Sequence, residues 1–148
     1  MREIKRDIVG AFLISQDKAI YLGEVGVYAG HLAVPGGGKE PGETDEQAVH
    51  REILEETGID IEGHNTTKCE DINTGESEKT LRDTGERVRV VMRFIDYIVQ
   101  LDKSSNELPT GGMDDFVNAK WYPLSTVSDL KLTPPTRARL IKLGYINE

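Results

Sequence analysis

One short acidic segment constrains this chain more than any other part of its sequence. Of the eight net negative charges on the 148 residues, seven fall between Lys39 and Glu62, where nine acidic residues accompany two basic ones. The middle of this segment carries helix signals. Thr44 is a good N-cap, Gln47 three residues later completes a capping box, and Gly58 is a typical helix terminator. The sequence therefore predicts a helix over residues 45–57.

Three glutamates share one face of this predicted helix. Glu52, Glu55 and Glu56 stand at positions i, i+3 and i+4, so they fall within an arc of roughly 100°. Like charges at these spacings destabilise a helix, so the cluster indicates a site that uses them. Mg²⁺ is commonly held by one or two carboxylates together with waters and substrate phosphates. A divalent-cation site is one interpretation of the cluster, and a solvated acidic face is the alternative.

A glycine-rich loop, residues 36–43, leads directly into the helix. Its glycines allow the backbone to approach an anion or a metal ion closely. The loop is not a Walker A motif, because Glu40 follows Gly38-Lys39 where Ser or Thr is required. The spacing of its glycines does not fit the dinucleotide-binding fingerprint either.

The composition narrows the class of protein. Hydrophobic residues make up 37% and charged residues 30%, so we expect a single domain over residues 1–148 with a buried core. The net charge of −8 argues against a nucleic-acid polymer as partner. Cys69 is the only cysteine, which excludes an intrachain disulfide. Because no apolar run is long enough for a membrane-spanning helix and no signal-peptide pattern is found, we expect a cytoplasmic protein with no membrane partner.

Patterns of apolar residues predict strands before and after the acidic helix. The expected strands are residues 8–15, 19–22, 31–34, 59–61, 88–101 and 119–122. We expect turns at residues 16–18, 73–75 and 83–85, and the glycines at 36–38 to stop the third strand. Pro134-Pro135 predicts the start of a last helix, over residues 136–143. This order of elements predicts a mixed α/β layered domain.

The loop and the helix together match a known motif at every fixed position. Beyond them, the N-terminal strand pair, residues 32–37, residues 121–124 and the Pro-Pro segment fit the same family more loosely. On these residues the chain resembles the Nudix hydrolases, and the MutT-like branch is the most similar. The nine matching positions of the Nudix box are Gly37, Glu43, Arg51-Glu52-Ile53, Glu55-Glu56 and Gly58-Ile59.

The resemblance implies an α/β/α sandwich around a mixed sheet. It also implies Mg²⁺- or Mn²⁺-dependent hydrolysis of a small molecule that contains a nucleoside diphosphate. Carried over by position, Arg51 would orient the glutamates and Glu43 would brace the loop. One glutamate would take the proton of the attacking water. The implied metal ligands are Glu52, Glu55, Glu56, the carbonyl of Gly37 and Asp115, for which a plain loop acid is the alternative.

The substrate is less constrained by the sequence. The short chain, without an added N-terminal domain, resembles the MutT branch, which implies hydrolysis of nucleoside triphosphates, oxidised ones included, to a monophosphate and pyrophosphate. The alternatives are an ADP-ribose or nucleotide-sugar pyrophosphatase and a noncatalytic nucleotide-sensing module. Residues 73–75 lack the proline that marks many ADP-ribose pyrophosphatases. All box glutamates are present, although a sensor is free to lose one.

Candidate substrate contacts lie outside the box. They are Arg87, Arg89 and Arg93 on the long predicted strand and Arg137 near the Pro-Pro turn, with exposed surface arginines as the alternative interpretation. Tyr28, Trp121 and Tyr122 are aromatic residues that can stack on a base, although core packing is the alternative for Trp121. Family analogy also implies a possible homodimer.

Overall fold

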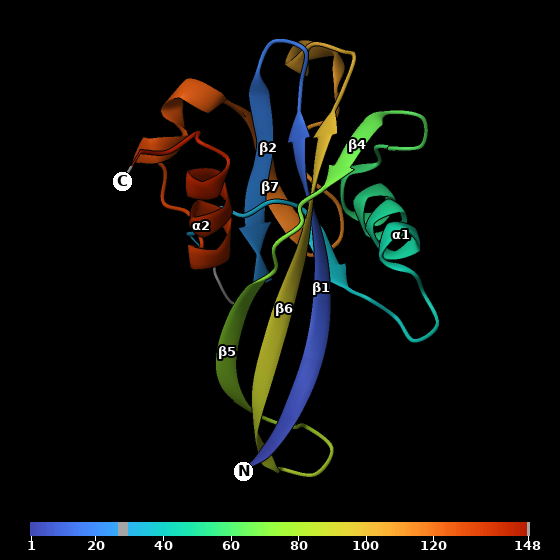
Figure 1. Ribbon diagram of the computed structural model, residues 1–148, viewed down its shortest axis with the longest axis vertical. Coiled ribbons are helices and arrows are strands. Elements are labelled where there is room, and N and C mark those ends of the chain that lie inside the picture. Colours follow the sequence, from blue (N-terminus) through green and yellow to red (C-terminus); the bar gives the residue numbers. More distant parts are fainter. Residues whose placement is uncertain (27–29, 148) are drawn as a thin grey trace.

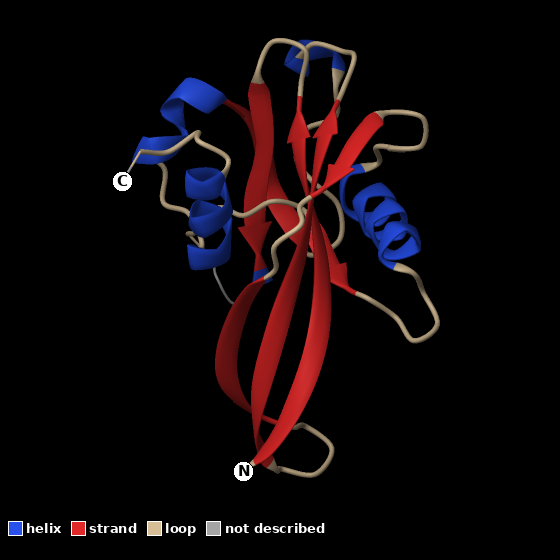
Figure 2. Cartoon of the chain, viewed as in Figure 1, coloured by secondary structure: helices blue, strands red, loops and turns tan. Residues whose placement is uncertain are grey.

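The computed structural model describes residues 1–26 and 30–147. Within them, two α-helices pack against a mixed seven-stranded sheet (Figures 1 and 2). The strands are β1 (Arg2–Ile14), β2 (Ala19–Val25), β3 (Gly36–Gly38), β4 (Asn65–Lys68), β5 (Asn73–Thr80), β6 (Arg87–Gln100) and β7 (Phe116–Pro123). The helices are α1 (Asp45–Thr57) and α2 (Pro134–Lys142), with short 3₁₀ segments η2 (Ser105–Glu107) and η3 (Leu124–Asp129).

The sheet is built around one parallel pair of long strands. β1 and β6 stay in register from Arg2 opposite Val88 to Ile14 opposite Gln100. All other strand pairs are antiparallel, and the main order is β4-β6-β1-β2-β7, with β3 added to β1 and β5 added to β6. The lower parts of β1, β5 and β6 extend beyond the helices, and the N-terminus lies at the end of this extension (Figure 1).

The two faces of the sheet carry separate cores. Side chains of β1 alternate between them: Val9 and Leu13 belong to the cluster that includes Ile53 of α1, whereas Phe12 and Ile14 belong to the one that includes Leu140 of α2. Figure 1 shows α1 and α2 on opposite sides of the sheet. The α/β/α sandwich implied by the sequence is therefore confirmed. No helix in residues 1–26 and 30–147 is long and apolar enough to cross a membrane.

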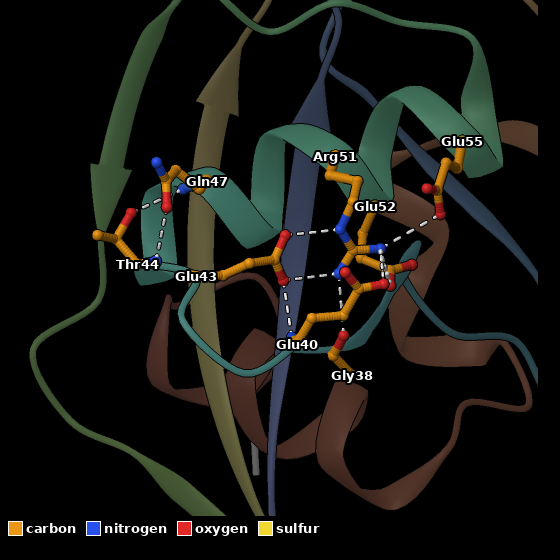
Figure 3. A network of polar contacts seen from close by, with 8 residues as sticks. All are labelled: Gly38, Glu40, Glu43, Thr44, Gln47, Arg51, Glu52 and Glu55. Atoms are coloured by element: carbon orange, nitrogen blue, oxygen red, sulfur yellow. Dashed lines mark hydrogen bonds and ion pairs between the residues drawn. The ribbon is translucent and has the colours of Figure 1, made fainter.

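The acidic helix has the predicted bounds. The Thr44 hydroxyl accepts a hydrogen bond from the Gln47 backbone N–H, and the Gln47 side chain accepts one from the Thr44 N–H (Figure 3). Gly58 ends the helix in the left-handed conformation with φ of 76°. α2 begins two residues earlier than expected, since both prolines belong to its first turn.

Several strand predictions were wrong. Residues 59–61 form no strand, and of residues 31–34 only Leu32 and Ala33 make isolated bridges. The glycines at 36–38, expected to stop a strand, instead form β3 against β1. The turn expected at residues 73–75 is the start of β5. β5 is polar and largely exposed, so it lacks the apolar alternation by which strands are recognised.

A buried arginine joins α2 to the sheet. Arg139 is 1% exposed and its Nε donates to Asp96 Oδ2 on β6 at 2.7 Å. Its Nη1 donates to Asp71 Oδ1 at 2.6 Å, and Lys142 Nζ binds the other oxygen of Asp71 at 2.6 Å. These cations hold the pKa of Asp71 well below its usual range. Burial raises the pKa of Asp96, although Arg139 opposes that rise.

We expect Arg139→Met to destabilise the fold by about 3–5 kcal/mol, because it leaves the buried Asp96 carboxylate without its partner. Urea denaturation measures this loss. Arg137→Met is the matched control on the same helix, since Arg137 is only half-buried and donates to the carbonyl of Leu130. Equal losses in the two variants would contradict the assignment of Arg139 as the ion-pair anchor of α2.

Candidate active site

Arg51 is the centre of the polar network on the acidic helix (Figure 3). Its guanidinium forms a fork with the Glu43 carboxylate, with Nε at 2.7 Å from Oε2 and Nη2 at 2.8 Å from Oε1. Nη2 also donates to the Gly38 carbonyl at 3.1 Å. The side chain therefore ties the glycine-rich loop to the helix. Hydrogen bonding to Arg51 lowers the pKa of Glu43 to about 2.

The same guanidinium contacts two glutamates of the predicted cluster. Nη1 donates to Glu52 Oε1 at 2.9 Å and lies 3.4 Å from Glu55 Oε2 (Figure 3). A single cation thus offsets part of the repulsion between these carboxylates. Its contacts are those of a residue that orients glutamates, which is the role that the resemblance implies.

The third glutamate is held by the loop backbone. Glu56 is 8% exposed, and its Oε1 accepts a hydrogen bond from the Gly36 N–H at 2.6 Å. Burial raises the pKa of Glu56 to about 7, and the nearby carboxylates of Glu52 and Asp115 act in the same direction. Asp115 therefore lies close enough to Glu56 for their charges to interact, although it comes from the loop before β7.

Gly37 is required by the position of Glu52. A Cβ at Gly37 would lie 2.4 Å from Glu52 Oε2, which is far inside van der Waals contact. The absence of a side chain lets the carboxylate pack directly against the β3 backbone. The glycine that the sequence singled out as a close-approach position therefore has that role here, with a carboxylate as the group that approaches.

A cavity of about 1060 Å³ opens beside these residues. Its acidic end is lined by Gly37, Glu52, Glu56 and Asp115, four of the five predicted metal ligands. Glu55 does not line it and is half exposed at its rim. The opposite end is mainly apolar, and its lining includes Val34, Ile72, Met92, Phe94, Pro135 and Ala138. A space of this size accommodates a nucleotide rather than a diphosphate alone.

The predicted substrate arginines are not brought to this cavity. Arg87 and Arg89 lie on the face of β6 opposite Met92 and Phe94, because alternate residues of a strand point to opposite faces. Arg137 donates to the Leu130 carbonyl at 2.9 Å. The geometry therefore gives no support to these three residues as substrate contacts.

The aromatic candidates have other positions. Trp121 stacks on Tyr21 with ring centroids 4.6 Å apart, and its Nε1 donates to the Pro109 carbonyl. It does not line the cavity, so the core-packing interpretation fits the structure. Tyr28 lies outside the described residues.

Sequence reasoning missed the residues at the apolar end of the cavity. Met92, Phe94 and Asp96 all lie within the strand predicted over residues 88–101, but none of them was predicted as a site residue. A signal for Asp96 was available, since it is the only acidic residue in β6, whose neighbours are mostly apolar. Asn73 also lines this end, from a segment that had been expected to turn.

The donors at the acidic end suit a hard cation. Across the described parts of the chain, no three acidic, histidine or cysteine side chains converge into a complete cation cage. The available groups are carboxylates from Glu52, Glu56 and Asp115 and the backbone of Gly37, which a side chain would block. Mg²⁺ accepts such a partial set of oxygen ligands, because water and substrate phosphates complete its coordination.

Comparisons with known proteins agree with this geometry. The model of the NUDIX domain matches residues 4–143. The nucleoside triphosphatase NudI of Enterobacter sp. (strain 638) is 31% identical over 123 residues, which is 82% of each chain. The chain belongs to the Nudix family, and it is a hydrolase that acts on diphosphate bonds.

Solved structures share the fold at lower identity. The E. coli dihydroneopterin triphosphate pyrophosphohydrolase is 18% identical and matches with a TM-score of 0.71, covering 94% of this chain and 96% of that one. A MutT structure, from work on Aliivibrio salmonicida and Vibrio cholerae, is 19% identical with a TM-score of 0.64, covering 94% and 95%. The family model and NudI confirm the predicted Nudix family, and these structures show that the fold is shared with a MutT protein.

We expect Arg51→Lys to lower the melting temperature by several degrees. Lysine keeps the charge but cannot form the fork with Glu43 while also reaching Glu52 and the Gly38 carbonyl. Arg93→Lys is the matched control, because Arg93 forms a similar fork with Asp7 at an exposed position. If thermal unfolding shows the same small effect in both variants, Arg51 does not organise the loop and helix as described.

Proposed function

We propose that this protein is a Mg²⁺-dependent pyrophosphohydrolase that converts a nucleoside triphosphate, oxidised forms included, to the monophosphate and pyrophosphate. The observation that carries this proposal is a single cavity with two different ends. Carboxylates of the Nudix box line one end, and Phe94 and Met92 line the other. The name of the relative NudI, a nucleoside triphosphatase, supports the same substrate class.

Different residues of the site have different roles in the proposed reaction. Bound at the acidic end, Mg²⁺ would neutralise the diphosphate oxygens and help to activate water. Glu52 and Glu56 face this end, with one oxygen of each already fixed by Arg51 and by the Gly36 N–H. A carboxylate of this cluster takes a proton from the attacking water. The water oxygen bonds to phosphorus, the bridging P–O bond breaks, and pyrophosphate leaves.

The apolar end of the cavity restricts the orientation of the bound nucleotide. Its apolar side chains exclude water from one face of the base, and aromatic contact with Phe94 favours a flat ring. The base would be held away from the carboxylates, so that only phosphates meet the negative end. This arrangement requires a cation there, because the phosphates and glutamates carry the same charge.

A substrate panel separates this proposal from its alternatives. The panel contains nucleoside triphosphates, oxidised dGTP, ADP-ribose, nucleotide sugars and dinucleoside polyphosphates, assayed for released phosphate with coupled pyrophosphatase, with Mg²⁺ and with EDTA. We expect metal-dependent turnover of a nucleoside triphosphate. A strong preference for ADP-ribose or a nucleotide sugar would assign the pyrophosphatase alternative, and nucleotide binding without turnover would assign the sensor.

We expect Glu56→Gln to lower kcat by ~10²–10⁴-fold while the protein stays folded. The substitution removes a charge that the cation or the proton transfer uses, and it relieves repulsion from Glu52 and Asp115. Glu55→Gln should also reduce kcat. Glu62→Gln, an exposed acid beyond the helix, is the control and should keep the activity. Full activity in both cluster variants would contradict the mechanism.

Gly37→Ala tests the cation site without changing a charge. Its new Cβ would displace the Glu52 carboxylate. The affinity for Mn²⁺, measured by electron paramagnetic resonance, should therefore fall about tenfold. Gly38→Ala is the matched control on the same strand, since the nearest side-chain atom there is the flexible tip of Arg6 at 3.3 Å. Equal affinities in the two variants would remove Gly37 and Glu52 from the site.

A further inference from the structure

A charged side chain lies among the apolar residues of the cavity lining, and β1 separates its strand from the β3 glycines of the loop. Asp96 is 6% exposed and lines the cavity from β6, beside Phe94 and Met92 on the same face of the strand. Arg139 Nε binds its Oδ2 at 2.7 Å. Within residues 1–26 and 30–147, Oδ1 has no hydrogen-bond donor. An ionised carboxylate placed in this way has a free acceptor that a ligand can reach.

The neighbouring strand leaves this oxygen uncovered. Gly10 of β1 stands directly opposite Asp96 in the parallel register. A Cβ at Gly10 would lie 3.7 Å from Asp96 Oδ1 and 3.4 Å from Val34 Cγ2, which are ordinary contact distances. A small side chain would therefore fit at position 10 but would cover the carboxylate oxygen. The glycine keeps the oxygen open to the cavity.

The chemistry of this end is that of a hydrogen-bonding edge beside a flat apolar wall. Asp96 offers an acceptor that faces the cavity, and Phe94 supplies an aromatic surface beside it on the same face of β6. A planar heterocycle that carries an N–H group matches both groups. Nucleobases present such groups, whereas a diphosphate without a bound cation is repelled by a carboxylate.

We propose that Asp96 determines the base specificity of this enzyme by accepting a hydrogen bond from an N–H group of the base. Arg139 is a positioning residue, since it fixes the orientation of Asp96 and does not touch the base. This inference rests on the proposed function, because it assumes a nucleotide in the cavity.

The test replaces the hydrogen of one N–H group on the base with a methyl group, which removes the donor that Asp96 would accept from. The nucleoside triphosphate with the highest kcat/KM in the panel is compared with its analogue methylated at the pairing-edge nitrogen. We expect the wild-type protein to prefer the unmethylated nucleotide by about tenfold or more in kcat/KM, since a hydrogen bond to a charged group is lost. The affinities of the two monophosphates, measured by calorimetry without added metal ion, should differ in the same direction.

Two variants of the site complete the design. In Asp96→Asn, the oxygen of the new amide must turn to Arg139, so its NH₂ group faces the cavity and the preference should disappear. Because this variant weakens a buried ion pair, Gly10→Ala provides a second test that leaves every charged group in place. Asp102→Asn, an exposed acid outside the cavity, is the control and should retain the wild-type preference. Circular dichroism establishes that each variant is folded.

The outcomes distinguish a failure of the Asp96 assignment from a failure of the proposed function. Loss of the preference in Gly10→Ala, with the control unchanged, supports the assignment of Asp96. Retention of the preference in both folded variants, or its absence in the wild-type protein, overturns that assignment and leaves Asp96 as a structural partner of Arg139. Failure of the wild-type protein to hydrolyse any nucleotide overturns the proposed function, and the Asp96 assignment with it.

Discussion

The parallel pairing of β1 with β6 is the constraint on which the rest of the structure depends. This register places Gly10 beside Asp96, and β1 also binds the three glycines of β3 on its other edge. The loop that carries Gly36 and Gly37 is therefore fixed against β1 before it reaches the helix. A Cβ at Gly36 would lie 2.1 Å from the Val9 carbonyl, so this contact is between backbones. Contacts with β1 therefore position residues at both ends of the cavity.

The active site concentrates negative charge that the fold must offset. Arg51 neutralises part of it and links Glu43, Glu52 and the Gly38 carbonyl in one network. Among the described residues, the remaining carboxylate, Glu56, has the Gly36 N–H as its single hydrogen-bond partner, and its raised pKa reflects the cost of its burial. The site is therefore organised for an additional positive charge, which agrees with the cation dependence proposed above.

The sequence predicted the acidic helix because its signals are local. Thr44, Gln47 and Gly58 act within a few residues of the helix ends, so their effect does not depend on the rest of the fold. The Nudix box likewise lies within one stretch of chain, and the structure brings Gly37, Glu52 and Glu56 to one cavity. Strands without apolar alternation could not be recognised in this way. β5 and β3 exist because β6 and β1 offer paired edges, which is a long-range effect.

The residues at the apolar end of the cavity could not be predicted from the sequence for a similar physical reason. Asp96 and Arg139 are 43 residues apart, and only the packing of α2 on the sheet makes them partners. Arginines on the exposed face of β6 were predicted as substrate contacts because a sequence does not show which face of a strand borders a cavity. The strand itself was predicted within one residue of its bounds, but which of its faces borders the cavity depends on the tertiary structure.

The cavity also has a consequence for how such an enzyme changes over time. Residues at its acidic end come from positions 36–56 and from Asp115, whereas most of those at the apolar end come from positions 72–76, 92–96 and 133–138, together with Val34 beside the loop. Under the function proposed above, hydrolysis and recognition of the base would therefore depend on largely separate stretches of the chain. Substitutions in the second set would then change the preferred nucleotide while the hydrolytic residues stay as they are.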